Sequence, residues 1–414
     1  MGRVLVVGIG PIPIEQSALP LGPGMRTWHF ASQLHAAGHR VRLVTIRPWE
    51  RIDDRQPPVP HADGLEEFRV RFNPSLELDA NLAAACADFQ PDAIFGITVP
   101  AAARVAPLAA ATPFWADVFG DYLAEAQLKA ERTRDDGALG DWHRELAAVL
   151  ARADMFSAVS RRQAWALVGQ IGSARRLTSA NVGYDFVRTV PCAVPDGDRR
   201  PPRTNAGAVN GAAVAALWSG SFNTWCDVVT FASGAEAALL TLPALRVEVT
   251  GGAVPGHDDH TFEEFRRFVA SSSAHERFLL HGWVSTDQLQ AIYARADFGV
   301  SLGRWSYERA LGSENRLAAL LARSIPVIVS AGSELASEIG EAGAGLVVPP
   351  EDPRAFYDAM RALATDRDRR NAMSHAAHTY AGQHLTYSVT ARPFLDWAEH
   401  PHIAPGRGTT DEHR

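Results

Sequence analysis

The sequence predicts two doubly wound, Rossmann-like α/β domains that face a cleft. Its 414 residues are too many for one ordinary hydrophobic core and suggest two domains of roughly 200 residues. Short β-rich runs alternate with helical patterns, an order that implies parallel strands with helices on both faces of each sheet. Residues 196–213, rich in Pro, Gly, Asn and Arg, lack apolar periodicity and are interpreted as a linker. The predicted domains are residues 1–195 and 214–385.

The first half begins with a β-rich run and a glycine-rich loop. A helix is expected from about Arg26 to Ala37, and Gly38 ends it. Further helical stretches rich in Ala, Leu and Arg separate the later strands. The β-rich runs of this half are "RVLVVGI", "HRVRLVTI", "PDAIFGITV", "TPFWADVF" and "ADMFSAVS".

The second half repeats the same alternation. A helix is expected from Asp227 to Leu240, after the first strand of this half. Ser285 and Asp352 stand where helix N-caps are expected, and Pro353 occupies a first helical position. The β-rich runs are "VAALWSG", "LRVEVTGG", "ERFLLHGWV", "ADFGVSLG", "IPVIVS" and "AGLVVPP". The tail, residues 401–414, is polar and is expected to be disordered.

Composition excludes several classes of protein. The net charge is −7 and no basic tract is present, which argues against nucleic acid as a partner. Three widely spaced cysteines argue against a disulfide framework and indicate reduced thiols in a cytoplasmic protein. No run approaches 18 apolar residues, so no transmembrane helix is expected. The apolar N-terminus is interpreted as a first strand and not as a signal peptide.

The opening strand ends in "GIGPIP", which resembles a dinucleotide-binding fingerprint only in part. Gly8 and Gly10 fit G-x-G-x-x-G, but Pro13 stands at the third glycine. Glu50 follows the second strand several residues later than a ribose-binding acid would. These departures argue against NAD or FAD binding.

A polar-ligand site is instead considered at "LGPGMRTW". Gly24 is placed at the start of the helix that carries Arg26, where free N–H groups and the helix dipole favour an anion. The alternative is a helix start that needs a flexible entry. Both interpretations stay open at the level of the sequence.

The stretch "YERALGSENRLAALLARSIPVIVS" places many polar groups between two buried elements. Leu317, Leu320 and Leu321 mark the buried face of a helix whose expected N-cap is Ser313. Glu314, Asn315 and Arg316 then lie in the first turn, where backbone N–H groups lack intrahelical partners. This turn falls at the carboxyl edge of the sheet, where α/β proteins bind ligands. A diphosphate is the expected ligand, and a solvated, capped surface helix is the alternative.

The second half resembles the nucleotide-sugar-binding domain of GT-B glycosyltransferases of the family-4, or group 1, type. The resemblance rests on "WSGSFNTWCD", "LRVEVTGG", "ERFLLHGWVSTDQLQAIYARADFGVSL", "YERALGSENRL" and "LARSIPVIVS…GLVVPPEDPRAF". It is strong after Val214 and looser in the first half, through "PGMRTWHFASQLHAAGHRVRLVT". It implies a GT-B fold whose C-terminal helix, within residues 386–400, returns to the first domain. Pro393, Phe394 and Trp397 are the expected anchors of that helix.

The resemblance also implies roles for individual residues. Main-chain groups at Trp283 and Val284 would bind the base. The helix opening would bind the diphosphate, and Glu308 would face the donor sugar. The diphosphate-binding residues implied at that opening are Ser313, Asn315 and Arg316.

This chain departs from the family pattern at two places. Ala319 occupies the position of a second Glu that binds the ribose, and strict spacing would put the first Glu at Leu311. The family's Arg and Lys after the first strand are replaced by "GSFNTW", which offers Ser221, Asn223 and backbone N–H groups. More of the phosphate neutralisation is therefore expected from Arg316 and helix dipoles.

Other polar residues have weaker signals. Asp117 ends a predicted strand of the first domain and is a candidate to bind an acceptor hydroxyl or to act as a base, or else to cap the next helix. His257, Asp258, Asp259 and His260 are interpreted as a solvated loop and not as a metal site. The resemblance likewise implies no bound metal and no permanent cofactor.

The leading hypothesis is a glycosyltransferase that moves a sugar from a nucleotide-diphosphate donor to a soluble acceptor, a small metabolite or a glycan. Catalysis would consist of positioning and stabilisation of the leaving diphosphate. Retention of configuration is the family expectation. The alternatives are a non-catalytic partner subunit that binds sugar nucleotides and a nucleotide-sugar epimerase on the same fold. The base, sugar, acceptor atom and oligomeric state stay open.

Overall fold

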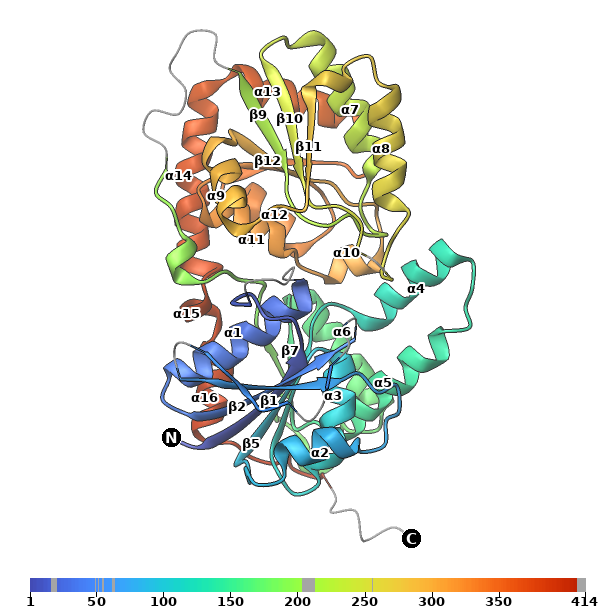
Figure 1. Cartoon of the computed structure of the whole chain (residues 1–414), viewed down its shortest axis with the longest axis vertical. Helices are drawn as coiled ribbons and strands as arrows, with labels where there is room; N and C mark the ends of the chain where they lie inside the picture. Colours follow the sequence, from blue (N-terminus) through green and yellow to red (C-terminus); the bar gives the residue numbers. More distant parts are fainter. Residues whose placement is uncertain are drawn as a thin grey trace. The chain divides into compact units, whose positions relative to one another are not determined.

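The structure, a computed structural model, describes residues 1–15, 21–48, 50, 52–53, 56–61, 64–202, 213–254 and 256–407. The chain forms two compact units. Unit 1 comprises Met1–Cys192 and Tyr387–Arg414, and unit 2 comprises Ala193–Thr386. Each unit is a twisted sheet covered by helices, as Figure 1 shows. The predicted two-sheet α/β fold is confirmed.

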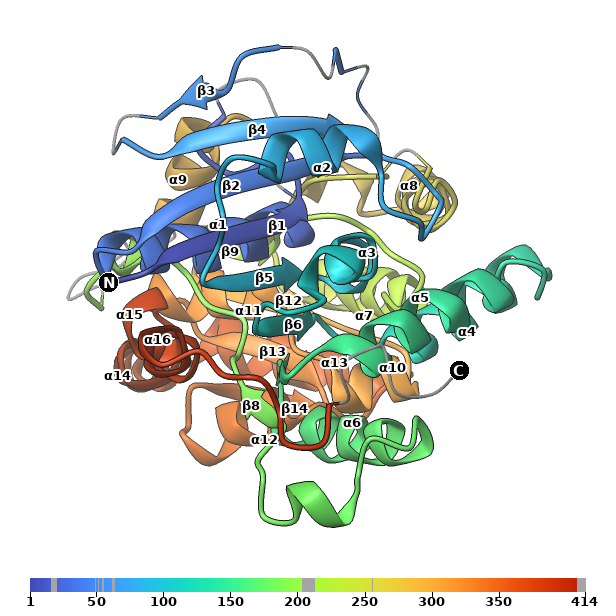
Figure 2. The ribbon, with the colours of Figure 1, turned by 90° about the horizontal axis from the view of Figure 1, so that it is seen from below.

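The sheet of unit 1 has the strand order β3-β4-β2-β1-β5-β6-β7-β8. Figure 2 shows its first six strands in this order, from β3 to β6. Its neighbouring strands pair in parallel except for β3 with β4. The strands are β1 (Arg3–Ile9), β2 (Arg40–Arg47), β3 (Val59–Pro60), β4 (Glu66–Arg71), β5 (Ala93–Ile97), β6 (Phe114–Val118), β7 (Met155–Ala158) and β8 (Val187–Thr189).

Alternate residues of β1 serve two apolar layers, one on each face of this sheet. Leu5 and Val7 belong to the layer built with α3, α5 and α6, whereas Val4 and Val6 belong to the layer built with α1 and α16. The helices of unit 1 are α1 (Gly22–Ala36), α2 (Ala80–Cys86), α3 (Val99–Val105), α4 (Tyr122–Thr133), α5 (Leu139–Arg152), α6 (Arg161–Ser173), α15 (Tyr387–Thr390) and α16 (Arg392–Glu399), with 3-10 turns η1 (Ala106–Ala109) and η2 (Ser179–Asn181).

The return of the C-terminal segment to unit 1 is confirmed. The Phe394 ring stacks on Phe30 of α1 with centroids 4.2 Å apart. Trp397 meets Phe95 and Trp115 edge-on at 5.4 and 5.5 Å. Pro393 is only partly buried, so it is a weaker anchor than predicted.

The tail is ordered further than predicted. Ala404 is buried, and its backbone N–H donates to Asp154 Oδ1 at 2.9 Å. Arg407 pairs with the same carboxylate. Burial raises the pKa of Asp154 above its usual value, although these two partners favour its charged form. Disorder is therefore the wrong description of residues 401–407, and residues 408–414 lie outside the described part.

The sheet of unit 2 is parallel throughout, in the order β11-β10-β9-β12-β13-β14. Its strands are β9 (Val214–Trp218), β10 (Leu245–Thr250), β11 (Phe278–Gly282), β12 (Phe298–Ser301), β13 (Val327–Ser330) and β14 (Gly345–Val348). The helices are α7 (Val228–Thr241), α8 (Thr261–Ser271), α9 (Thr286–Arg295), α10 (Tyr307–Leu311), α11 (Asn315–Ala322), α12 (Glu334–Glu341), α13 (Pro353–Thr365) and α14 (Arg367–His384), with 3-10 turns η3 (Asp196–Asp198) and η4 (His275–Arg277).

Part of the predicted linker is packed on unit 2. Asp198 pairs with Arg323 at 2.8 Å, and the carbonyl of Arg200 accepts from Ser324 Oγ at 2.6 Å. Residues 203–212 of this segment lie outside the described part. The three cysteines are buried, and no disulfide joins them in the described part of the chain. Within the described ranges, no helix has both the length and the apolar composition needed to cross a bilayer.

We expect Phe394→Ala to lower the free energy of unfolding of unit 1 by about 3–5 kcal/mol, because it empties a fully buried ring site in the α1–α16 layer. Urea denaturation followed by fluorescence measures the change. Arg392→Ala, at an exposed position of the same helix, is the control. A loss below about 1 kcal/mol for Phe394→Ala would show that α16 is not part of the core.

Candidate functional site

The carboxyl ends of the parallel strands of unit 2 gather several loops at one edge of the sheet. Figure 1 shows α10 and α11 at the end toward which β9, β10 and β11 point. The loops after β9, β10 and β11 lie at this edge, and so does the segment between β12 and α11. Such edges are where open α/β sheets bind ligands.

Two glycines bring the first two loops into contact. Gly251 has a φ of +85°, and a Cβ there would lie 2.2 Å from the carbonyl oxygen of Gly220. Phe222 N–H also donates to the Gly252 carbonyl at 3.0 Å. The β9–α7 loop is therefore held against the backbone that follows β10.

The predicted ligand residues Ser221 and Asn223 lie on this loop. Asn223 Nδ2 donates to Ser221 Oγ at 3.2 Å. Asn223 Oδ1 and the Thr224 hydroxyl are buried, and neither has a hydrogen-bond partner among the described residues. Buried polar atoms without a partner are uncommon, so these two acceptors are available for a ligand or water.

Trp283 and Val284 follow β11, where the sequence places them. The left-handed backbone of Gly282, with a φ of +65°, turns the chain toward α9. Trp283 is 38% exposed, and its Nε1 donates to the Ala253 carbonyl at 3.2 Å. Ser285 caps α9 in a capping box with Gln288, which confirms the predicted cap.

Helix α11 begins one residue later than predicted. Its N-cap is Glu314 and not Ser313, and the Glu314 side chain makes no capping hydrogen bond. Asn315 and Arg316 occupy the first turn, as predicted. Within the described residues, no acceptor is bonded to their backbone N–H groups. The start of α11 therefore presents free donors and the positive end of its dipole.

Arg316 extends from this turn over the β9–α7 loop. Its Nη2 donates to the Ser221 carbonyl, and its guanidinium lies 4.5 Å from the centroid of the Trp218 ring. The side chain is partly exposed. A positive charge is thus fixed between the loop and the α11 N-terminus.

Glu308 does not point freely into the site. Both of its oxygens accept from Arg309, Oε2 from Nε at 2.6 Å and Oε1 from Nη2 at 2.5 Å. The residue is only 7% exposed. The predicted sugar-facing role is corrected, because this carboxylate is committed to a buried ion pair.

Arg309 also pairs with Glu314, at 2.7 Å from Nη1 to Oε1. Glu314 in turn accepts from the hydroxyl of Ser301 on β12. Burial alone would lower the pKa of Arg309, but the two carboxylates outweigh it and raise that pKa, so the guanidinium stays charged. Sequence reasoning missed Glu314, Arg309 and Ser301. The only signal was a cluster of charges next to buried strands.

Three predicted residues of unit 1 are structural in this geometry. Helix α1 starts at Gly22, so Gly24 lies inside its first turn, and a Cβ there would lie 1.8 Å from the Pro11 carbonyl oxygen. Arg26 is buried and binds Asp117 through two bonds of 2.7 and 3.0 Å. Gly24 therefore serves close packing, and Arg26 faces the interior and not a ligand.

The proposed acceptor role of Asp117 is corrected for the same reason. Its carboxylate is 0% exposed and also accepts from Ser157 Oγ at 2.6 Å. Arg26 further donates to the carbonyls of Val190 and Pro191 at 2.8 and 3.0 Å. The pair joins α1, β6, β7 and the segment after β8 inside unit 1.

The polar run before α8 is a capping loop. Asp258 accepts from the backbone of His260 and Thr261 at 2.9 Å and from the Thr261 hydroxyl at 2.7 Å. In the part of the chain that the structure describes, no group of three His, Cys, Asp or Glu side chains is arranged to hold a metal ion. Burial raises the pKa of the Cys226 thiol and so favours its protonated form.

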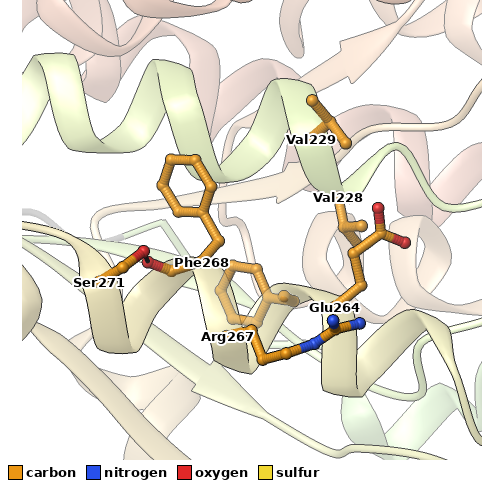
Figure 3. Close-up of a pocket in the computed structure, with 7 residues that line it drawn as sticks. Val228, Val229, Glu264, Arg267, Phe268 and Ser271 are labelled. Atoms are coloured by element: carbon orange, nitrogen blue, oxygen red, sulfur yellow. Dashed lines mark hydrogen bonds between the residues drawn. The ribbon is translucent and has the colours of Figure 1, made fainter.

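A hollow of about 360 Å³ lies between α7 and α8 and contains none of the predicted site residues (Figure 3). Val228, Val229 and Phe268 give it an apolar wall, and Glu264 and Arg267 lie along its side. It is separate from the loops described above.

The sequence of unit 2 decides the family. Residues 216–366 match the model of the family described as "Glycosyl transferases group 1". This chain carries a group 1 glycosyltransferase domain. The match spans the edge with the β9–α7 loop, Trp283, Arg309 and α11. The predicted glycosyltransferase class is confirmed by this match. The search of curated proteins found no match to this sequence.

Solved structures show that the whole glycosyltransferase has the GT-B fold. A sucrose-phosphate synthase from Thermosynechococcus elongatus matches with a TM-score of 0.73 at 17% identity, over 96% of this chain and 98% of that one. HepE from Anabaena, in complex with UDP-glucose, matches with 0.69 at 12% identity, over 96% and 100%. A UDP-forming trehalose-phosphate synthase from Burkholderia vietnamiensis matches with 0.66 at 13% identity, over 96% and 98%.

We expect Glu308→Gln to reduce the free energy of unfolding of the glycosyltransferase by roughly 3 kcal/mol, because it removes one charge of a buried pair. Urea denaturation measures the change. If Glu308→Gln left stability unchanged but greatly reduced turnover, Glu308 would act on the reacting sugar and not in a structural ion pair.

Proposed function

We propose that the carboxyl edge of unit 2 binds the diphosphate of a nucleotide-sugar donor and that the enzyme transfers the sugar to a small metabolite or glycan. One observation supports this most. The N-terminus of α11 has free N–H donors, and the Arg316 guanidinium is fixed beside it. Charge-assisted bonds to phosphate oxygens are each worth roughly 1.5–3 kcal/mol.

Arg316 supplies the charge that this chain lacks elsewhere in the site. The family's Arg and Lys after the first strand are absent from "GSFNTW", Gly220 to Trp225. Arg316 reaches that same loop, where it contacts the Ser221 carbonyl and the Trp218 ring. The cation of the proposed site therefore comes from α11 and not from the β9–α7 loop. Ser221 and Asn223 then offer neutral hydrogen bonds to the same ligand.

The base side of the donor is proposed to lie at Trp283 and Val284, after β11. Main-chain groups there face the same edge, and Trp283 gives a partly exposed aromatic surface. A uridine base is the first choice because HepE, a structure of the same fold, is in complex with UDP-glucose. Ala319, packed beside the α11 core, cannot bind ribose hydroxyls through a carboxylate.

The chemistry follows from these groups. As the bond from the anomeric carbon to the diphosphate breaks, negative charge grows on the leaving oxygen. The α11 N–H groups and Arg316 stabilise that charge without reorganising, since both are held by the fold. Positioning of the acceptor beside the anomeric carbon supplies the remaining acceleration. Glu308 takes no part in this reaction, because both of its carboxylate oxygens are paired with Arg309.

The absence of a carboxylate at Ala319 favours one second candidate, a non-catalytic subunit that binds sugar nucleotides. An epimerase on the same fold is a third. Mass spectrometry of reactions with UDP-sugars separates the three. A new glycoside or donor hydrolysis marks a transferase, an isomeric donor marks an epimerase, and unchanged donor marks a binding subunit.

We expect UDP, at a concentration 100 times its dissociation constant, to stabilise the protein by about 2.7 kcal/mol, and UMP at the same concentration to stabilise it less. Arg316→Ala should weaken UDP binding roughly tenfold or more while the fold survives, because the residue is a partly exposed first-turn side chain. Thermal unfolding and calorimetry measure both effects.

Arg354→Ala, an exposed arginine on α13, is the matched control and should bind UDP normally. The same measurements are repeated with GDP and dTDP. The donor-site proposal is abandoned if no nucleoside diphosphate shifts the melting temperature. If Arg316→Ala binds UDP with unchanged affinity, Arg316 is not part of the donor site, but the rest of the proposal stands.

A further inference from the structure

Glu314 occupies an N-cap position but does not cap its helix. The N-caps of α7, α9, α10, α12, α13 and α14 all accept hydrogen bonds from first-turn N–H groups through their side chains. Glu314 makes no such bond, although its side chain carries two acceptor oxygens. Both oxygens are instead bound on the sheet side, by Ser301 and Arg309.

The position of this carboxylate matters for an anion at the same helix end. A side-chain oxygen at an N-cap accepts from the N–H groups of the second or third helical residue. A carboxylate that did so at α11 would occupy donors that a diphosphate needs and would add a like charge beside it. Holding Glu314 away from the helix axis removes both forms of competition.

The cation that holds Glu314 is itself fixed on several sides. Arg309 donates two hydrogen bonds to Glu308, and its guanidinium lies 5.6 Å from the centroid of the Trp225 ring. Gly303 leaves room for it, because a Cβ there would lie 2.8 Å from Arg309 Cδ. Ser301 holds the second Glu314 oxygen from a buried position on β12.

We propose that Ser301 and Arg309 form a tether that keeps the Glu314 carboxylate off the α11 N-terminus and so keeps that end open for the donor diphosphate. The inference rests on the proposed donor site. It makes Ser301 and Arg309 positioning residues that act through Glu314 and touch no substrate. The tether also explains how an acidic residue, Glu314, can stand at the N-cap of α11 next to a proposed diphosphate site.

The test is a double-mutant cycle with UDP and with inorganic pyrophosphate as probes. Ser301→Ala releases one oxygen of Glu314, which can then cap α11. A capping bond of about 1 kcal/mol must then be broken on binding, so both probes should bind roughly fivefold more weakly. Glu314→Gln alone should bind within twofold of the wild type. Ser301→Ala combined with Glu314→Gln should regain most of the lost affinity, because the competing charge is gone.

Calorimetry gives the affinities, and thermal unfolding checks that each variant is folded. Ser374→Ala, a buried serine of α14 that donates to the Ser324 carbonyl at 2.7 Å, is the matched control. Wild-type affinity in Ser301→Ala, or a double variant as weak as Ser301→Ala, overturns the tether while leaving the donor site intact. Failure of the wild type to bind UDP and pyrophosphate overturns the donor site itself.

Discussion

The buried guanidinium of Arg309 is the interaction on which the polar edge of unit 2 depends. It holds two carboxylates that belong to different segments, Glu308 of α10 and Glu314 before α11. Breaking a buried pair typically costs 3–5 kcal/mol, because the remaining charge is left uncompensated. The two pairs therefore connect α10 to the segment that precedes α11.

Unit 1 also contains buried arginines that pair with carboxylates, but these pairs have a structural role. Arg26 is buried against Asp117, and Arg47 is buried among Glu15, Glu50 and Glu67 at distances of 2.7 Å. The carboxylates outweigh the effect of burial and raise the pKa of Arg47. Both arginines join the ends of parallel strands to neighbouring loops or helices. Buried arginines thus lie at strand ends in both units.

The proposed donor site contains few ionic groups. The α11 dipole, backbone N–H donors and Arg316 replace the basic pair expected after the first strand of the family domain. Groups that are fixed before the ligand arrives need little reorganisation, which suits stabilisation of a leaving diphosphate. Both carboxylates near the proposed site are paired with Arg309, which offsets part of their negative charge.

The sequence by itself determined the alternation of strands and helices, the caps at Ser285 and Asp352, and the edge where Trp283 and Arg316 lie. Those features depend on local periodicity, on cap chemistry and on the rule that parallel strands end at one edge. Tertiary structure alone decided the partners of Asp117 and Glu308, because the residue types do not specify which cation a buried carboxylate meets. Likewise, α1 starts at Gly22 and not near Arg26. The Gly-Pro-Gly segment has low helix propensity, but Gly24 lets this turn pack against the Pro11 carbonyl.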